Sequence, residues 1–80
     1  MDKDIKSIIV LLATQAMINL GEIKDPVTGA AKVNLEGAAV FKELVSVLEV
    51  KTRNNLTEAE AQFLEEVTEN LEKAYQNKLN

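Results

Sequence analysis

The segment from Ile5 to Leu20 predicts a helix with apolar side chains on almost every side, and no other feature constrains the fold as strongly. At about 100° per residue, one broad side collects six apolar residues, which are Ile5, Ile9, Leu12, Ala13, Ala16 and Leu20. Leu11 and Ile18 fall on the remaining strip, which is mainly polar. A helix that is apolar nearly all round is normally covered nearly all round. Other parts of the chain, or a second molecule, are therefore expected to cover this helix.

The chain is short and has few ways to stabilise its fold. It has 80 residues, and a domain somewhat smaller than this buries only about 60% of the surface that its unfolded chain exposes. It contains neither cysteine nor histidine, which excludes a disulfide and removes the usual zinc ligands. We therefore expect a single domain, residues 1–80, that is stabilised by helix packing or by oligomerisation.

Local signals at three positions predict where the helices begin and end. Gly21 is typical of the residue that follows a helix, which predicts a first helix over 4–20. Asn34 is suited to cap a second helix over 35–50. Thr57 and Glu60 have the spacing of a capping box, which predicts a third helix over 57–77. The expected fold is all-α, a three-helix domain with an irregular arm between helix 1 and helix 2.

The arm, residues 21–33, has no amphipathic period. Within it, Asp25, Pro26 and Gly29 are the residues that a tight turn requires. The arm could instead form a short hairpin, with residues 22–24 against residues 31–33. The turn could also serve as a recognition loop, although a bare turn is the preferred interpretation.

The second helix has a clean apolar side, and we expect this side to face the core with Val40, Phe41, Leu44, Val45, Val47 and Leu48. Gly37 lies within the same side, where glycine costs about 1 kcal/mol relative to alanine. We expect it to permit close approach of the first helix near Ala13 or Ala16. Asn19 lies close to the apolar side of the first helix and needs either the backbone or another polar group as a partner.

The order and spacing of several short motifs resemble a known family. The motifs are Leu12-Ala13-Thr14-Gln15-Ala16-Met17, Leu20-Gly21-Glu22-Ile23, Asp25-Pro26 with Thr28-Gly29, Leu48-Glu49, Lys51-Thr52-Arg53 and Asn55-Leu56-Thr57. Over nearly the whole chain they look like the small bacterial family catalogued as domain of unknown function 1844. The resemblance implies a compact, mainly helical, cytoplasmic protein with no assigned activity. The chain departs from the family pattern at Asn54, where glycine is favoured, and at residues 30–32, where acidic residues are favoured.

The composition argues against several functions. Acidic residues outnumber basic ones by 13 to 9, for a net charge of -4, so we expect no binding to nucleic acid, which requires Lys and Arg to neutralise phosphates. The hydroxyl side chains have no histidine or cysteine partner, so we expect no enzyme activity and no catalytic residue. Glu65, Glu69 and Glu72 lack a matching inward pair on another helix, so we expect no metal. The glycines form no phosphate-binding motif, and no cofactor is expected.

The chain also lacks the signs of export or membrane insertion. The apolar run from Ile8 to Ala13 is far shorter than the ~20 residues of a membrane span. Asp2 and Asp4 dilute the positive charge in front of it, and no cleavage pattern follows it. We expect a cytoplasmic protein without membrane contact.

Two groups of residues are candidate binding sites. Lys51 and Arg53 lie near the N-terminus of the third helix at Thr57, where charge and backbone donors could hold an anion. Capping of two adjoining helix ends explains the same residues and is preferred.

The second candidate site is a self-association surface on the first helix, formed by Leu11, Ile18, Thr14, Gln15 and Val10. The alternative is that the arm and the other helices cover Leu11 and Ile18 within one chain. We favour self-association, because two helices and a short arm can hardly surround a third helix. The predicted function is that of a small interaction protein that forms a homo-oligomer, most simply a dimer. An adaptor for another cytoplasmic protein and an anion-binding or small-molecule-binding regulator are the alternatives.

Overall fold

The structure is a computed structural model that describes residues 5–79, and it contains three helices. Helix α1 spans Ile5–Asn19, α2 spans Leu35–Lys51 and α3 spans Glu58–Leu79. No strand occurs within residues 5–79. The all-α prediction is confirmed, and the predicted helix ends agree to within two residues, except that residue 4 lies outside the described part.

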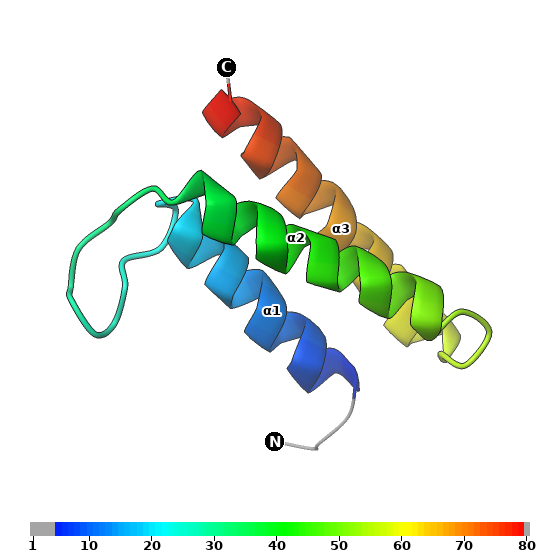
Figure 1. Cartoon of the computed structure of the whole chain (residues 1–80). Helices are drawn as coiled ribbons and strands as arrows, with labels where there is room; N and C mark the ends of the chain where they lie inside the picture. The colour runs from blue at the N-terminus through cyan, green and yellow to red at the C-terminus, as the bar shows by residue number, and fades with distance from the viewer. Residues whose placement is uncertain (1–4, 80) are drawn as a thin grey trace.

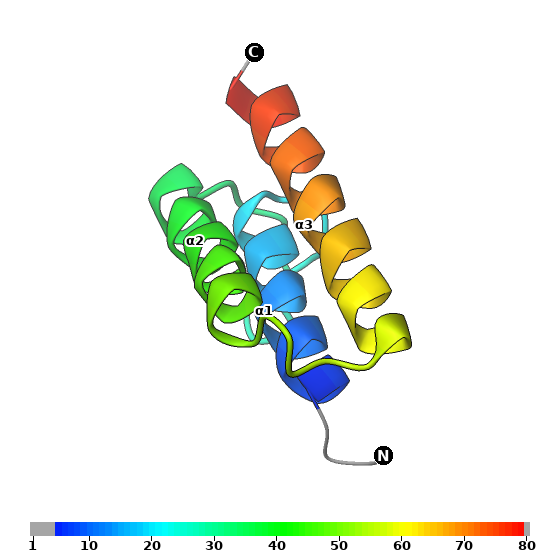
Figure 2. The ribbon, with the colours of Figure 1, turned by 90° about the vertical axis from the view of Figure 1, so that its right-hand side faces the viewer.

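Each helix packs against both others around one hydrophobic core. Figure 1 shows α1 and α2 side by side, and Figure 2 shows α1 lying between α2 and α3. The fully buried side chains of this core come from all three helices and are Ile9, Ala16, Val45, Leu64 and Leu71. The broad side predicted for the first helix is the side that the core uses, because Ile5, Leu12 and Ala13 pack against the same cluster.

The arm between α1 and α2 is closed at its base by the backbone. Gly21 takes a left-handed φ of 78° after α1, and the amide of Asn34 then donates to the carbonyl of Asn19 at 2.6 Å. Further out, the amide of Asp25 donates to the carbonyl of Ala30 at 3.0 Å. These bonds hold a loop rather than the hairpin of the alternative interpretation, since residues 21–34 contain no strand. They also make α2 return antiparallel along α1 (Figure 1).

The tip of the arm is the tight turn that the sequence predicts. The carboxylate of Asp25 accepts a hydrogen bond from the amide of Val27 at 2.8 Å, and its carbonyl accepts one from the amide of Gly29 at 2.7 Å. Gly29 has a φ of 74°, which suits glycine. Val27 projects into solvent and is 90% exposed.

The side chain closest to Gly37 is not one of those expected from the sequence. A Cβ atom at this position would lie 3.0 Å from both Cγ and Nδ2 of Asn19, and 3.1 Å from Nδ2 of Asn34. The expected neighbours, Ala13 and Ala16, were therefore wrong. The reason is that Asn19 ends α1 at the level where α2 begins, so its amide group occupies the space beside Gly37. Asn34 caps α2 as predicted, because its Oδ1 accepts from the amide of Gly37 at 3.0 Å.

The connection between α2 and α3 follows its local signals closely. Asn54 has a left-handed φ of 70°, and the hydroxyl of Thr52 donates to the carbonyl of Leu48 at 2.7 Å. At the start of α3 the hydroxyl of Thr57 accepts from the amide of Glu60 at 3.1 Å. The carboxylate of Glu60 accepts in return from the amide of Thr57 at 2.9 Å. The capping box is confirmed.

Candidate interaction surface on helices α1 and α2

Five large apolar side chains of α1 and α2 are exposed on the outside of this helix pair. Their exposed fractions are 48% for Ile8, 61% for Leu11, 55% for Val40, 41% for Leu44 and 46% for Val47. We call these five residues the α1–α2 face. Scattered exposed apolar residues are normal on proteins, whereas contiguous apolar patches mark interaction sites. The question is therefore whether the five residues adjoin.

Helical geometry places the five residues next to one another. Asn19 contacts Gly37 and so marks the line where α1 and α2 meet. Ile8 precedes Asn19 by eleven residues, close to three whole turns, and Leu44 follows Gly37 by seven, close to two turns. Both Ile8 and Leu44 therefore lie along the meeting line. The other three residues lie less than a quarter turn beyond it, on the outside of each helix.

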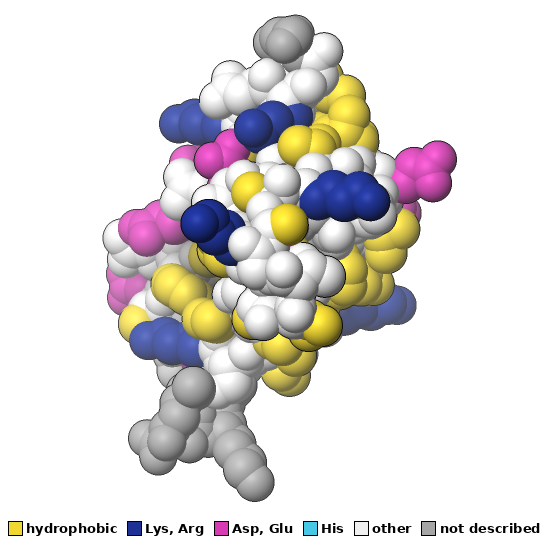
Figure 3. All heavy atoms as spheres, turned by 90° about the vertical axis from the view of Figure 1, so that its left-hand side faces the viewer, with side chains coloured by type: hydrophobic (Ala, Val, Ile, Leu, Met, Phe, Trp, Pro, Cys, Tyr) yellow, Lys and Arg dark blue, Asp and Glu magenta, His cyan; other side chains and the backbone are white. Residues whose placement is uncertain are grey.

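The antiparallel arrangement of the two helices also brings the residues to matching levels. Counting back from Asn19 along α1 and forward from Gly37 along α2, Leu11 reaches the level of Leu44 and Ile8 reaches the level of Val47. The α1–α2 face is thus one continuous patch. Figure 3, viewed from the end that carries the arm, shows hydrophobic side chains on its right-hand side, where α2 lies, with acidic and basic side chains among them.

The sequence predicts core positions for three of these residues, Val40, Leu44 and Val47, and that prediction is wrong. The apolar side of α2 is wider than its two neighbours can cover. Val45 is buried, and Phe41 and Leu48 pack against the core cluster, whereas Val40, Leu44 and Val47 stay exposed. The width of the apolar side of α2 predicts that other residues cover it. It does not tell whether those residues belong to the same chain or to a second molecule.

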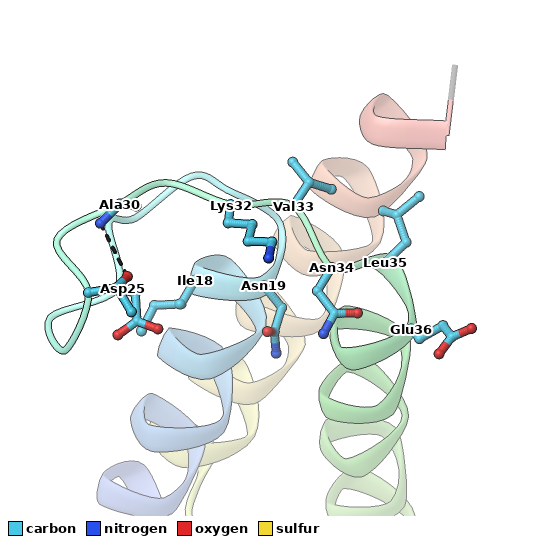
Figure 4. Close-up of a pocket in the computed structure, with 10 residues that line it drawn as sticks. Ile18, Asn19, Asp25, Ala30, Lys32, Val33, Asn34, Leu35 and Glu36 are labelled. Carbon is cyan, nitrogen blue, oxygen red and sulfur yellow. Dashed lines mark hydrogen bonds between the residues drawn. The ribbon is translucent and has the colours of Figure 1, made fainter.

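The five residues predicted to form the self-association surface fall into two environments. Leu11, Val10, Thr14 and Gln15 are all exposed on α1. Ile18 is half-buried and lines the hollow beneath the arm, near Asp25 and Ala30 (Figure 4). The arm thus partly covers Ile18 within the chain, as the alternative interpretation proposes, while Leu11 remains open.

The hollow beneath the arm has a volume of about 710 Å³ and a mixed lining. The lining combines the aliphatic side chains of Ile18, Val33 and Leu35 with polar side chains. Figure 4 shows the side chain of Lys32 reaching toward Asn19. Most of the polar residues that line it are exposed, and water therefore competes for their hydrogen bonds. This hollow is a weaker candidate site than the apolar face.

The structure does not gather the residues of the predicted anion site in one cavity. Lys51 lines a shallow hollow on α2 with Val47 and Val50. Arg53 lines a separate one between α2 and α3, together with the carboxylates of Glu49 and Glu65. The hydroxyl of Thr57 is engaged in the capping box. Helix capping thus accounts for Thr57 without a ligand, and an anion site at these residues stays a prediction.

The main ion pair of the helices lies away from the α1–α2 face. Lys42 places its Nζ 2.9 Å from Oε2 of Glu72 and 5.4 Å from the ring centre of Tyr75, which joins α2 to α3. Lys42 donates a hydrogen bond to the Glu72 carboxylate and Gln76 donates another, and both lower the pKa of Glu72. Lys42 lies more than a third of a turn from Val47 around α2. No charge of this cluster interrupts the apolar face.

Other classes of site find little support in the part of the chain that the structure describes. Within residues 5–79 no three acidic side chains come together in a way that could hold a metal ion. None of the three helices is long and apolar enough to cross a membrane.

The fold and this surface define a small all-α protein whose main exposed feature is the apolar α1–α2 face. The chain belongs to the family described as domain of unknown function DUF1844, whose sequence model matches residues 2–77. This match confirms the resemblance seen in the sequence motifs. No curated protein and no solved structure matches the chain.

Proposed function

We propose that this protein is a small, non-catalytic interaction protein that self-associates through its α1–α2 face. The observation that carries the proposal is the exposure of Ile8, Leu11, Val40, Leu44 and Val47, which helix geometry places side by side on the outside of α1 and α2. Large apolar side chains gain roughly 1.5 to 3 kcal/mol each when they pass from full exposure to full burial. Because these side chains are partly exposed, burying them in an interface would add a fraction of that free energy for each one.

The size of the molecule is consistent with an interface of this kind. The chain exposes 5635 Å² in total, and a standard interface takes about 800 Å² from each partner. One face of a three-helix molecule can supply that area. Self-association would also strengthen a fold that has neither a disulfide nor, within the described residues, a metal cluster.

Sedimentation equilibrium of the unmodified chain at micromolar concentration tests the proposal. We expect a mass of twice 8.8 kDa that falls toward the monomer on dilution. A mass that stays at the monomer value throughout would contradict self-association. It would instead favour the adaptor alternative, in which the same face binds a different protein.

A further inference from the structure

The charges at the two ends of the exposed side of α2 have opposite sign. Glu36 lies at the beginning of the helix and Lys51 at its end, and both side chains are exposed. Between them, on the same outer side, lie Val40, Leu44 and Val47. Within residues 5–79 neither Glu36 nor Lys51 forms an ion pair in its own chain. Both charges are therefore available to a partner.

The order of charged and apolar residues along α2 is complementary to the same order read in the opposite direction. Glu36 and Lys51 lie equally far from the middle of the stretch, between Glu43 and Leu44, and Val40 and Val47 do as well. An antiparallel copy of α2 would set Val40 against Val47 and Glu36 against Lys51 of the other copy, and it would set Leu44 beside Glu43. A parallel copy would set Glu36 against Glu36 and Lys51 against Lys51, and like-charge contacts disfavour an interface.

We propose, building on the self-association proposed above, that two copies pack their α1–α2 faces about a two-fold axis that passes near Leu44. Helix α2 lies antiparallel to α2 of the second copy, and Glu36 of each copy faces Lys51 of the other. Closed two-fold dimers use the same patch on both subunits, which a self-complementary pattern satisfies. The chemistry of the partner is thus that of a second copy of this chain.

Helix α1 fits the same arrangement. Leu11 lies level with Leu44. A two-fold axis that lies in the interface and crosses both helices at this level therefore passes near Leu11 as well. It sets Leu11 against Leu11 of the second copy, and Ile8 lies beside this contact. Glu43 lies at the outer edge of the stripe, where it is exposed and screened by water and salt.

A charge exchange tests the arrangement. We expect Glu36→Lys alone and Lys51→Glu alone each to weaken dimerisation about tenfold at low salt, because each change creates two like-charge contacts per dimer. The double variant Glu36→Lys/Lys51→Glu restores the opposite charges, and its dissociation constant is expected within about threefold of the unmodified chain. The constants are measured by sedimentation equilibrium, with circular dichroism to confirm equal helix content. Glu65→Lys on exposed α3 is the matched control and is expected to leave the constant unchanged.

The helix dipole offers another reason for an acid at the start and a base at the end of α2. The helix dipole acts within one chain. If it were the only reason for the two charges, the losses in dimer affinity caused by Glu36→Lys and by Lys51→Glu would add in the double variant. Additive losses, or single variants that dimerise normally, would overturn the antiparallel arrangement while leaving self-association intact. A monomeric unmodified chain would overturn both proposals.

Discussion

Replacing Leu44 with glutamate is expected to turn the dimer into a folded monomer. Leu44 lies near the proposed two-fold axis, so the dimer of the variant would bring two carboxylates together in an apolar contact. Like charges placed together in an interface cost several kcal/mol, and every 1.4 kcal/mol weakens binding about tenfold. We therefore expect at least a hundredfold rise in the dissociation constant measured by sedimentation equilibrium.

The Leu44→Glu monomer should keep its helices, because Leu44 is 41% exposed and is not one of the buried core residues. Circular dichroism is expected to give the helix content of the unmodified chain. Gln62→Glu, at an exposed position of α3, adds the same charge elsewhere and should leave the dimer intact. If Leu44→Glu dimerises as well as this control, the α1–α2 face is not the contact surface.

Replacing Leu71 with alanine is expected to destabilise the fold by about 2 to 5 kcal/mol. Leu71 belongs to α3 and packs in the shared core with Ile9, Ala16, Val45 and Leu64. Its side chain is 1% exposed, so the truncation leaves a cavity that the neighbours can close only in part. Domains of this size are stable by only a few kcal/mol to about 12 kcal/mol in total. The variant therefore loses a large fraction of the free energy of unfolding.

Urea unfolding followed by circular dichroism measures this loss. All variants are compared at one protein concentration, because dimerisation adds to apparent stability. Gln62→Ala on the exposed side of the same helix is the control and should change the free energy of unfolding by less than about 0.5 kcal/mol. A loss below about 1 kcal/mol for Leu71→Ala would mean that α3 does not pack on the core as described.

The helices could be predicted because their ends depend on neighbouring residues alone. Thr57 and Glu60 satisfy each other's backbone amides within one turn, and Asn34 caps α2 through an amide three residues away. Such contacts need no knowledge of the rest of the chain. The turn at Asp25 is local in the same way.

The candidate surface could be predicted only in part, because it depends on how many neighbours each helix has. The spacing of apolar residues predicts that α2 has an apolar side. It does not predict which residues of that side are buried, and in the structure Val45 is buried while Val40 and Val47 are not. Ile18 resembles Leu11 in the helical pattern, yet the path of the arm gives the two residues different surroundings. The neighbour of Gly37 was missed for the same reason, since Asn19 reaches it only through the tertiary arrangement.

A single cysteine in place of Leu44 tests the proposed contact surface most directly, because the chain has no other cysteine. Near a two-fold axis, the introduced thiol of one copy would lie beside the same thiol of the second copy, and a disulfide requires Cα atoms to approach within about 7 Å. Under mild oxidation, Leu44→Cys is therefore expected to form a covalent dimer rapidly and at micromolar concentration. Gln62→Cys, on exposed α3, should crosslink only slowly by random collision. Equal rates for the two variants, measured on non-reducing gels, would contradict self-association through the α1–α2 face.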